Sequence, residues 1–150
     1  MQKLWITIGK IYSGTSEAEA VFGQITWAFA EKWDLTIGAR KTEEDKTGFK
    51  EYVGIFGQSG AGSFDDTTST FILEHDYSEN TNVYFKVAEG FKAGGFNAES
   101  SNPFAASTPY APETIESTEL GLKGRYLDNR MMLNIAYFDN EHEDMQISYF

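Results

Sequence analysis

Apolar and polar residues alternate along this 150-residue chain in runs of about ten residues. In residues 33–42, for example, Trp33, Leu35 and Ile37 are each followed by a polar residue or glycine. Successive side chains of a β-strand point to opposite faces, so this pattern predicts strands with one apolar and one polar face. Seven runs of this kind occur, at residues 3–12, 21–30, 33–42, 67–77, 82–91, 114–126 and 130–141.

The lengths of these strands and of their connections indicate a membrane barrel. Strands that cross a bilayer need about 9–11 residues, whereas strands of globular proteins average about 5–6. Short and long connections alternate, a layout typical of outer-membrane barrels. The short ones are 31–32, 78–81 and 127–129, and the long ones are 13–20, 43–66 and 92–113. The expected fold is therefore all-β: an antiparallel, up-and-down transmembrane β-barrel segment of about seven long strands, with short periplasmic turns and long extracellular loops.

Composition excludes several other classes. The formal net charge of −11 argues against nucleic-acid binding, which needs clustered Lys and Arg. The absence of cysteine removes disulfide frameworks, thiol catalysis and cysteine-based zinc sites. Met1 is followed directly by an alternating pattern and not by a signal peptide. Because a barrel protein must be exported, we expect the natural N-terminus to lie upstream of this sequence.

The two strand faces carry different side chains. Seven charged residues fall on the polar side, which faces the lumen in a barrel: Arg40, Glu74, Asp76, Lys86, Glu119, Lys123 and Arg125. His75 is the exception, because it falls among apolar neighbours. Aromatic residues gather near the short turns, where amphipathic rings suit a membrane–water interface. The predicted girdle consists of Trp27, Phe29, Trp33, Tyr77, Tyr84 and Tyr126.

Two blocks of sequence resemble a known family. The first begins Ala20-Val-Phe-Gly-Gln and continues through Lys32-Trp-Asp-Leu-Thr-Ile-Gly-Ala-Arg. The second contains Gly90-Phe-Lys-Ala-Gly-Gly-Phe-Asn97, then Tyr110-Ala-Pro-Glu with Glu119-Leu-Gly-Leu-Lys, and then Asp128-Asn-Arg. In order and spacing these motifs, which cover about 120 residues, are similar to the barrels of TonB-dependent outer-membrane receptors.

This resemblance implies a fold, a location and a function. The complete family fold is a barrel of about 22 strands with a plugged lumen. Residues 1–150 would be a partial barrel domain that lacks the plug, the TonB-contacting segment and the last strands. The expected function is active uptake of a scarce nutrient, most naturally a ferric siderophore or similar iron complex, in the outer membrane of a Gram-negative bacterium. The implied partners are outer-membrane lipid, the inner-membrane TonB complex acting through the missing plug region, and the nutrient itself. Neither enzymatic activity nor a cofactor is expected.

Three clusters invite a chemical interpretation. Glu141-His142-Glu143-Asp144 could hold a metal ion, but a solvated loop is favoured because no second histidine lies nearby. The acidic residues of segment 43–66 could contact a divalent cation or a substrate, although a solvated extracellular loop is favoured there too. The glycines of Gly57–Gly62 lack the Lys-Ser/Thr ending of a phosphate loop and predict a flexible loop. No catalytic, cofactor or metal residue is therefore assigned, and substrate-binding residues are left unassigned.

Local residue choice predicts details of the backbone. Asp128-Asn129 can adopt tight-turn dihedral angles. Gly121 and Gly124 within a strand indicate close packing or curvature, and Gly94-Gly95 relieve the backbone where a strand opens into a loop. An alternative class remains, a soluble antiparallel β-protein that binds a small ligand. A hydrolase on a β-scaffold is a weaker third option, which no residue constellation supports.

Overall fold

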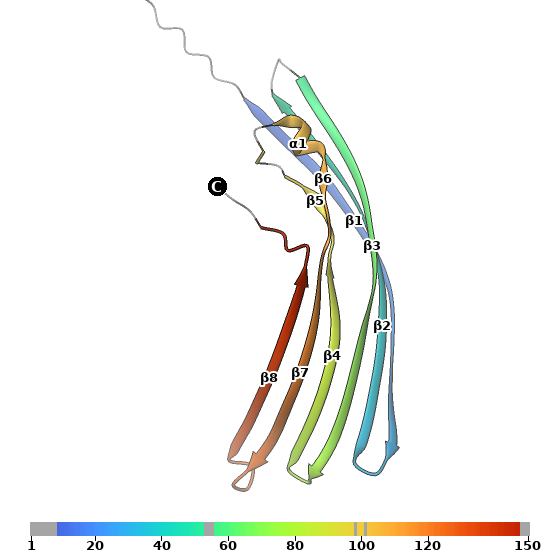
Figure 1. Cartoon of the computed structure of the whole chain (residues 1–150), viewed down its shortest axis with the longest axis vertical. Coiled ribbons are helices and arrows are strands. Elements are labelled where there is room, and N and C mark those ends of the chain that lie inside the picture. The colour runs from blue at the N-terminus through green and yellow to red at the C-terminus, as the bar shows by residue number, and fades with distance from the viewer. Residues whose placement is uncertain (1–8, 53–55, 98, 101, 148–150) are drawn as a thin grey trace, which may run out of the picture. The chain divides into compact units, whose positions relative to one another are not determined.

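The computed structural model describes residues 9–52, 56–97, 99–100 and 102–147. Within these ranges six strands form one sheet, in the order β1–β2–β3–β4–β7–β8 (Figure 1). They are β1 Lys10–Ala30, β2 Trp33–Tyr52, β3 Phe56–Ser78, β4 Thr81–Lys92, β7 Glu113–Tyr126 and β8 Met131–Glu143. The connection between β4 and β7 carries helix α1 Pro103–Ser107 and a small two-stranded sheet of β5 Gly95–Phe96 and β6 Pro109–Tyr110.

The all-β prediction is confirmed, but two predicted loops are wrong. Residues 13–20 belong to β1, which merges two predicted strands, although residues 1–8 lie outside the described ranges. Most of segment 43–66 belongs to β2 and β3. The reason is that backbone pairing of strands continues where both faces of the sheet are exposed to water. A strand with polar residues on both faces lacks the apolar alternation from which strands are predicted.

The chain clusters into two compact units, which are described separately. The first unit contains Met1–Glu19, Glu43–Asp65 and Ala93–Pro112. The second contains Ala20–Thr42, Asp66–Lys92 and Glu113–Phe150. The long strands β1, β2 and β3 contribute residues to both units.

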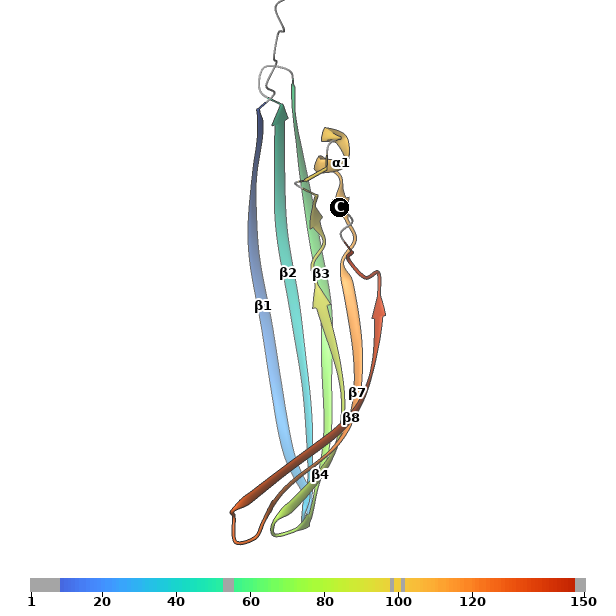
Figure 2. The same cartoon turned by 90° about the vertical axis from the view of Figure 1, so that its left-hand side faces the viewer.

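In the second unit, three short turns lie together at one end (Figures 1 and 2). Lys32 adopts a positive φ of 70° in the first turn. The last turn contains three consecutive residues in the left-handed region, Leu127 at 56°, Asp128 at 54° and Asn129 at 65°. Asp and Asn tolerate this region better than other non-glycine residues, so the predicted role of Asp128-Asn129 is confirmed.

The register of the second unit pairs apolar residues with apolar residues on one face and polar residues with polar residues on the other. Phe85 lies opposite Leu120, which in turn lies opposite Tyr137, and this row continues the apolar face across three strands. Lys86 lies opposite Glu119 on the other face. Leu120 is 54% exposed and Tyr137 is 75% exposed, so large apolar side chains remain uncovered in this unit. Apolar side chains gathered on one strand face in this way fit contact with lipid.

The first unit has a small core of its own. Phe64, Ala93 and Ala106 are buried there. Phe96 packs against Gly48 and Gly60, where an added Cβ would lie within 3 Å of its ring. Glycine therefore lets the connection between β4 and β7 pack closely on β2 and β3. In the described ranges, no helix has the length and hydrophobicity needed to cross a membrane.

Candidate functional site

The polar face of the second unit carries cross-strand contacts between charged and aromatic groups. The hydroxyl of Tyr84 donates a hydrogen bond to the carboxylate of Glu119, which lies opposite Lys86. Nζ of Lys123 lies 4.6 Å from the centroid of the Tyr84 ring, a cation–π distance. Gly121 leaves room for this ring, because an added Cβ would clash with it. The prediction that Gly121 marks close packing is confirmed.

Tyr84 therefore does not belong to the predicted aromatic girdle, because its ring lies on the polar face with Glu119. Three other girdle residues do contact one another on the apolar face. Ring centroids are 5.8 Å apart for Trp27 and Phe29, and 6.4 Å apart for Phe29 and Trp33. These rings lie at the short-turn end, where the sequence predicted them.

His75 completes this aromatic cluster. Its ring stacks on Trp33 with a centroid separation of 4.2 Å and an interplanar angle of 25°. Its Nδ1 lies 3.1 Å from the carbonyl oxygen of Lys32 in the adjacent turn. The histidine can therefore occupy the apolar face, since its ring packs on another ring while its nitrogen reaches a backbone acceptor.

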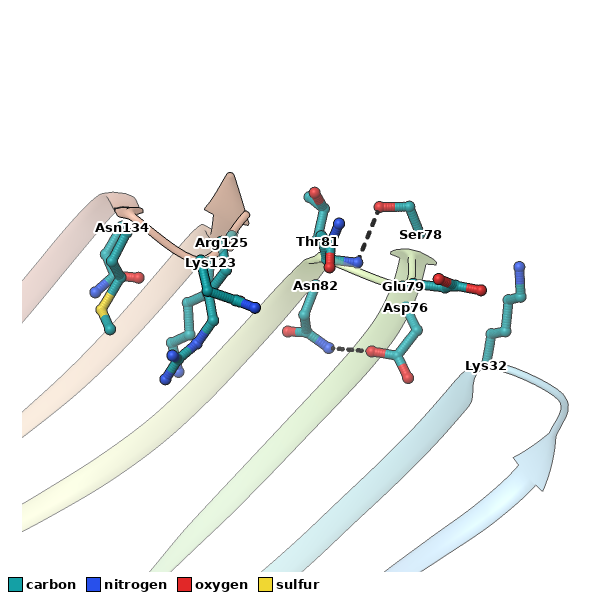
Figure 3. Close-up of a pocket in the computed structure, with 13 residues that line it drawn as sticks. Lys32, Asp76, Ser78, Glu79, Thr81, Asn82, Lys123, Arg125 and Asn134 are labelled. Atoms are coloured by element: carbon teal, nitrogen blue, oxygen red, sulfur yellow. Dashed lines mark hydrogen bonds between the residues drawn. The ribbon is translucent and has the colours of Figure 1, made fainter. Parts of the chain in front are cut away.

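At the short-turn end the polar face forms an open pocket of about 750 Å³ (Figure 3). Nδ2 of Asn82 donates a hydrogen bond to Oδ1 of Asp76 over 3.1 Å, across β3 and β4. Lys123 and Arg125 of β7 project on the same side of the sheet. Asn134 of β8 lines the other edge. Three of these five residues, Asp76, Lys123 and Arg125, belong to the set that strand alternation predicted to face the lumen.

A second arrangement lies in the first unit, where two lysines of β2 hold the connection between β4 and β7. Nζ of Lys46 donates to the carbonyl oxygen of Gly94 over 2.9 Å, and Nζ of Lys50 donates to that of Ser100 over 2.6 Å. Lys50 is only 3% exposed. These bonds satisfy backbone acceptors that strand pairing leaves free. They link the connection between β4 and β7 to strand β2.

Glu44 belongs to the same stretch of β2, beyond the ten or so residues nearest the turn that would cross a membrane. The hydroxyl of Ser16 donates to its Oε1 over 2.6 Å, and Nζ of Lys46 lies 3.1 Å from that oxygen. The hydrogen bond from Ser16, with the nearby ammonium, lowers the pKa of Glu44 below its ordinary value. The acidic run at 43–45 thus forms part of a paired strand, and not the solvated loop that was predicted.

The flexible-loop prediction for Gly57–Gly62 is also wrong, because these residues belong to β3. An added Cβ at Gly60 would lie 2.7 Å from the Phe96 ring and closer still to the carbonyl oxygen of Ser107. Gly94 likewise packs against the carbonyl oxygen of Tyr110. These glycines are required by close approach of the chain, a signal that sequence alone confuses with flexibility.

The end of β7 away from the short turns carries a third arrangement, centred on Glu113. Its carboxylate accepts from Nζ of Lys92 at 3.5 Å and from the backbone N–H of Gln146 at 3.1 Å, and Nδ1 of His142 lies 3.2 Å away. Glu113 lies beyond the membrane-spanning part of β7. The hydrogen bond from Gln146, helped by His142 and Lys92, lowers the pKa of Glu113 below its ordinary value.

The predicted solvated loop at residues 141–144 is in fact largely strand, because β8 extends to Glu143. Glu141 lies directly opposite Glu116, which lies opposite Glu89, so carboxylates line up across three strands. Among the described residues, no group of three or more His, Cys, Asp or Glu has an arrangement that could hold a metal ion. His142 instead contacts Glu113.

Both the sequence and the structure of this chain are similar to those of known proteins. The family model for the TonB dependent receptor-like beta-barrel matches residues 6–150. The pesticin receptor of Yersinia pestis is 26% identical over 138 residues, which is 89% of this chain and 20% of that receptor. The pesticin receptor of Yersinia enterocolitica gives the same identity and coverage. The chain thus spans about a fifth of the length of the curated relatives it matches.

Three solved structures share the fold. The ferric yersiniabactin uptake receptor FyuA from Yersinia pestis has a TM-score of 0.82 and 22% identity, over 93% of this chain and 22% of that one. The siderophore receptor PiuA from Acinetobacter baumannii has a TM-score of 0.71 and 22% identity, over 85% and 19%. The alcaligin outer-membrane receptor FauA from Bordetella pertussis has a TM-score of 0.67 and 20% identity, over 87% and 21%.

The matched family and the strand architecture both indicate an outer-membrane β-barrel. Receptors of this family are outer-membrane transport proteins of Gram-negative bacteria, and not enzymes. The match extends over nearly the whole chain, and long paired strands with short turns at one end fit it. The chain therefore belongs to the TonB-dependent receptor β-barrel family and is an outer-membrane barrel segment.

Proposed function

We propose that this chain forms part of the barrel wall of a receptor that imports a ferric siderophore or a similar iron complex. The observation that carries the proposal is the family match combined with the descriptions of three structural relatives. They are a ferric yersiniabactin uptake receptor, a siderophore receptor and an alcaligin receptor. Uptake would be driven by the inner-membrane TonB complex, acting through the plug region of the receptor.

The two faces of the second unit suit a wall between lipid and a wet interior. Exposed apolar side chains such as Ile25, Leu120 and Tyr137 would be covered by lipid, and burial of one large apolar side chain is worth about 1.5–3 kcal/mol. The opposite face, with Lys86 and Glu119, would line the interior. Charged groups on that face would contact the imported complex, water or the plug.

A soluble protein that binds a small ligand is disfavoured by the same apolar face. Val21 is 79% exposed and Ile25 is 75% exposed, values that in water would promote association rather than a stable monomer. Catalysis forms no part of the proposal. The polar groups of the second unit form structural contacts such as Tyr84 to Glu119, which position strands and not a reacting atom.

Uptake by cells tests the proposal. The natural gene that encodes this chain would be expressed in a Gram-negative host that lacks its own siderophore receptors, and uptake of ⁵⁵Fe-labelled siderophores would be measured. We expect accumulation of iron with at least one phenolate or hydroxamate siderophore, and loss of that accumulation when the host lacks TonB. Uptake that is equal with and without the gene, or that continues without TonB, would overturn the proposal.

A further inference from the structure

The chain changes direction sharply where β8 ends. β8 stops at Glu143, and Asp144 adopts a positive φ of 53°, so residues 144–147 leave the line of the strand (Figure 1). The neighbouring strand β7 begins at Glu113, and Pro112 before it has no N–H group with which to extend the ladder. Pairing between the two strands therefore ends here, and the backbone N–H groups of residues 144–147 need other acceptors.

Glu113 supplies one of these acceptors with its side chain. Its Oε2 accepts from the backbone N–H of Gln146 over 3.1 Å, while Oε1 lies 3.2 Å from Nδ1 of His142. These two donors lie on either side of Asp144, so one carboxylate closes the turn around that residue. Lys92, which lies opposite Glu113 in the register, places its Nζ 3.5 Å from Oε2. The Glu113 side chain is only 15% exposed, which fits a carboxylate enclosed by these groups.

Residues 144–147 bury little apolar surface of their own. Met145 is 55% exposed and Ile147 is 60% exposed, whereas Gln146 is half-buried. A segment with few buried apolar contacts opens at a low cost in free energy, so its position depends strongly on the polar contacts that hold it. Such a segment can exist in two states, bound to Glu113 or released from it. The contacts of the carboxylate set the balance between these states.

The face that carries Glu113 determines where the segment lies. Glu113, Glu119 and Lys123 occupy alternate positions of β7 in an unbroken register with β4, so they share the polar face. Glu113 therefore holds residues 144–147 on the side that is the interior in a barrel, at the end away from the short turns. We propose that residues 144–147 form a strap that Glu113 latches over the rim of the interior, and that this strap swings away when the latch is lost.

The inference concerns the end of the sheet and not transport, so it can fail while the proposed uptake stands. Because the chain contains no cysteine, nitroxide labels can be placed at M145C and M131C, two exposed positions, in the 150-residue chain in detergent micelles. The distance distribution between the labels is then measured by EPR. A latched strap gives one narrow component, and a released strap adds a broad one.

Removal of the charge on Glu113 should release the strap. We expect E113Q to raise the ratio of the broad to the narrow component about three- to tenfold, because an amide oxygen accepts a weaker hydrogen bond than a carboxylate. The matched control is E116Q, which makes the same change of charge on the other face of β7 and should leave the ratio unchanged. Equal ratios in E113Q and the unaltered chain, or in E113Q and E116Q, would overturn the inference.

A second variant tests whether His142 acts through Glu113. H142A should raise the same ratio by less than E113Q does, and should add nothing in the double variant E113Q/H142A. The protection of the Leu120 amide, in the middle of β7, against hydrogen exchange should stay unchanged in every variant, as expected if the sheet itself remains intact. Additive effects of E113Q and H142A, or a loss of protection at Leu120, would also overturn the inference, because the strap would then have no separate latch.

Discussion

The clearest prediction concerns Gly60, which lets the β4–β7 connection pack on β3. Substitution by alanine would place a methyl group 2.7 Å from Cε1 of Phe96 and closer still to the carbonyl oxygen of Ser107. Contacts below 3.0 Å are essentially never found for a Cβ atom, so the backbone at Ser107 must retreat by roughly 1 Å. Overpacking of this kind costs about 1–3 kcal/mol. At about 1.4 kcal/mol per factor of ten, the local folded state of the connection should weaken about 5- to 150-fold.

Hydrogen exchange in helix α1 reports this loss directly. The amide of Ala106 donates to the carbonyl oxygen of Asn102 over 2.9 Å, and Ala106 is 1% exposed, so its exchange requires the connection to open. We expect the protection factor in α1 of G60A, folded in detergent, to fall by that 5- to 150-fold. The matched control is G23A, because an added Cβ at Gly23 meets nothing within 4 Å. Unchanged protection in G60A, or an equal loss in G23A, would refute the reasoning.

Three further predictions follow from the same structure. K50Q removes the ammonium donor to the partly buried carbonyl oxygen of Ser100 and should destabilise the β4–β7 connection by about 1–3 kcal/mol, whereas K10Q should not. Hydrogen exchange in the connection measures both variants. The pKa of Glu113 lies below its ordinary value, so its stabilising effect is present above that ordinary value and is lost as pH falls through the lowered pKa. The protection factor of the Gln146 amide, measured relative to the intrinsic exchange rate at each pH, should therefore fall in acid, and E113Q should abolish that dependence. In the described sheet, β1 and β8 have no strand partner on their outer edges, so the sheet does not close into a pore. The 150-residue chain in a planar bilayer should therefore give no stable unitary conductance. A steady single-channel current would contradict this prediction.

Alternation predicted the faces of the second unit because lipid and water impose different demands on the two sides of a strand. Phe85, Leu120 and Tyr137 were each placed on the apolar side from sequence, and the register brings them into one row. The same signal disappears in residues 43–52, where β2 continues with polar residues on both faces. The sequence therefore predicted the parts of the strands that have one apolar face. It did not predict the polar continuations of these strands, such as residues 43–52 of β2.

The contacts of the candidate site depend on register, which one sequence does not specify. Lys86 and Glu119 were both assigned to the polar face, but a shift of two residues between β4 and β7 would keep that assignment and separate the pair. Asn82, whose side-chain oxygen has no hydrogen-bond partner among the described residues, had no sequence signal at all. The burial of a single side-chain atom depends on which residues lie opposite it on the neighbouring strands. It can therefore be determined only when the strand register is known.

His75 shows how an exception to a pattern can carry structural information. A histidine on an apolar strand face is costly unless its nitrogen atoms find partners. At this position it stacks on Trp33, and Nδ1 reaches the carbonyl oxygen of Lys32, which also accepts from the backbone N–H of Asp76. The turn brings the carbonyl group of Lys32 and the ring of Trp33 together within reach of His75. The residue that breaks the alternation thus belongs to the same ring cluster as Trp27 and Phe29, and amphipathic rings of this kind suit a membrane–water interface.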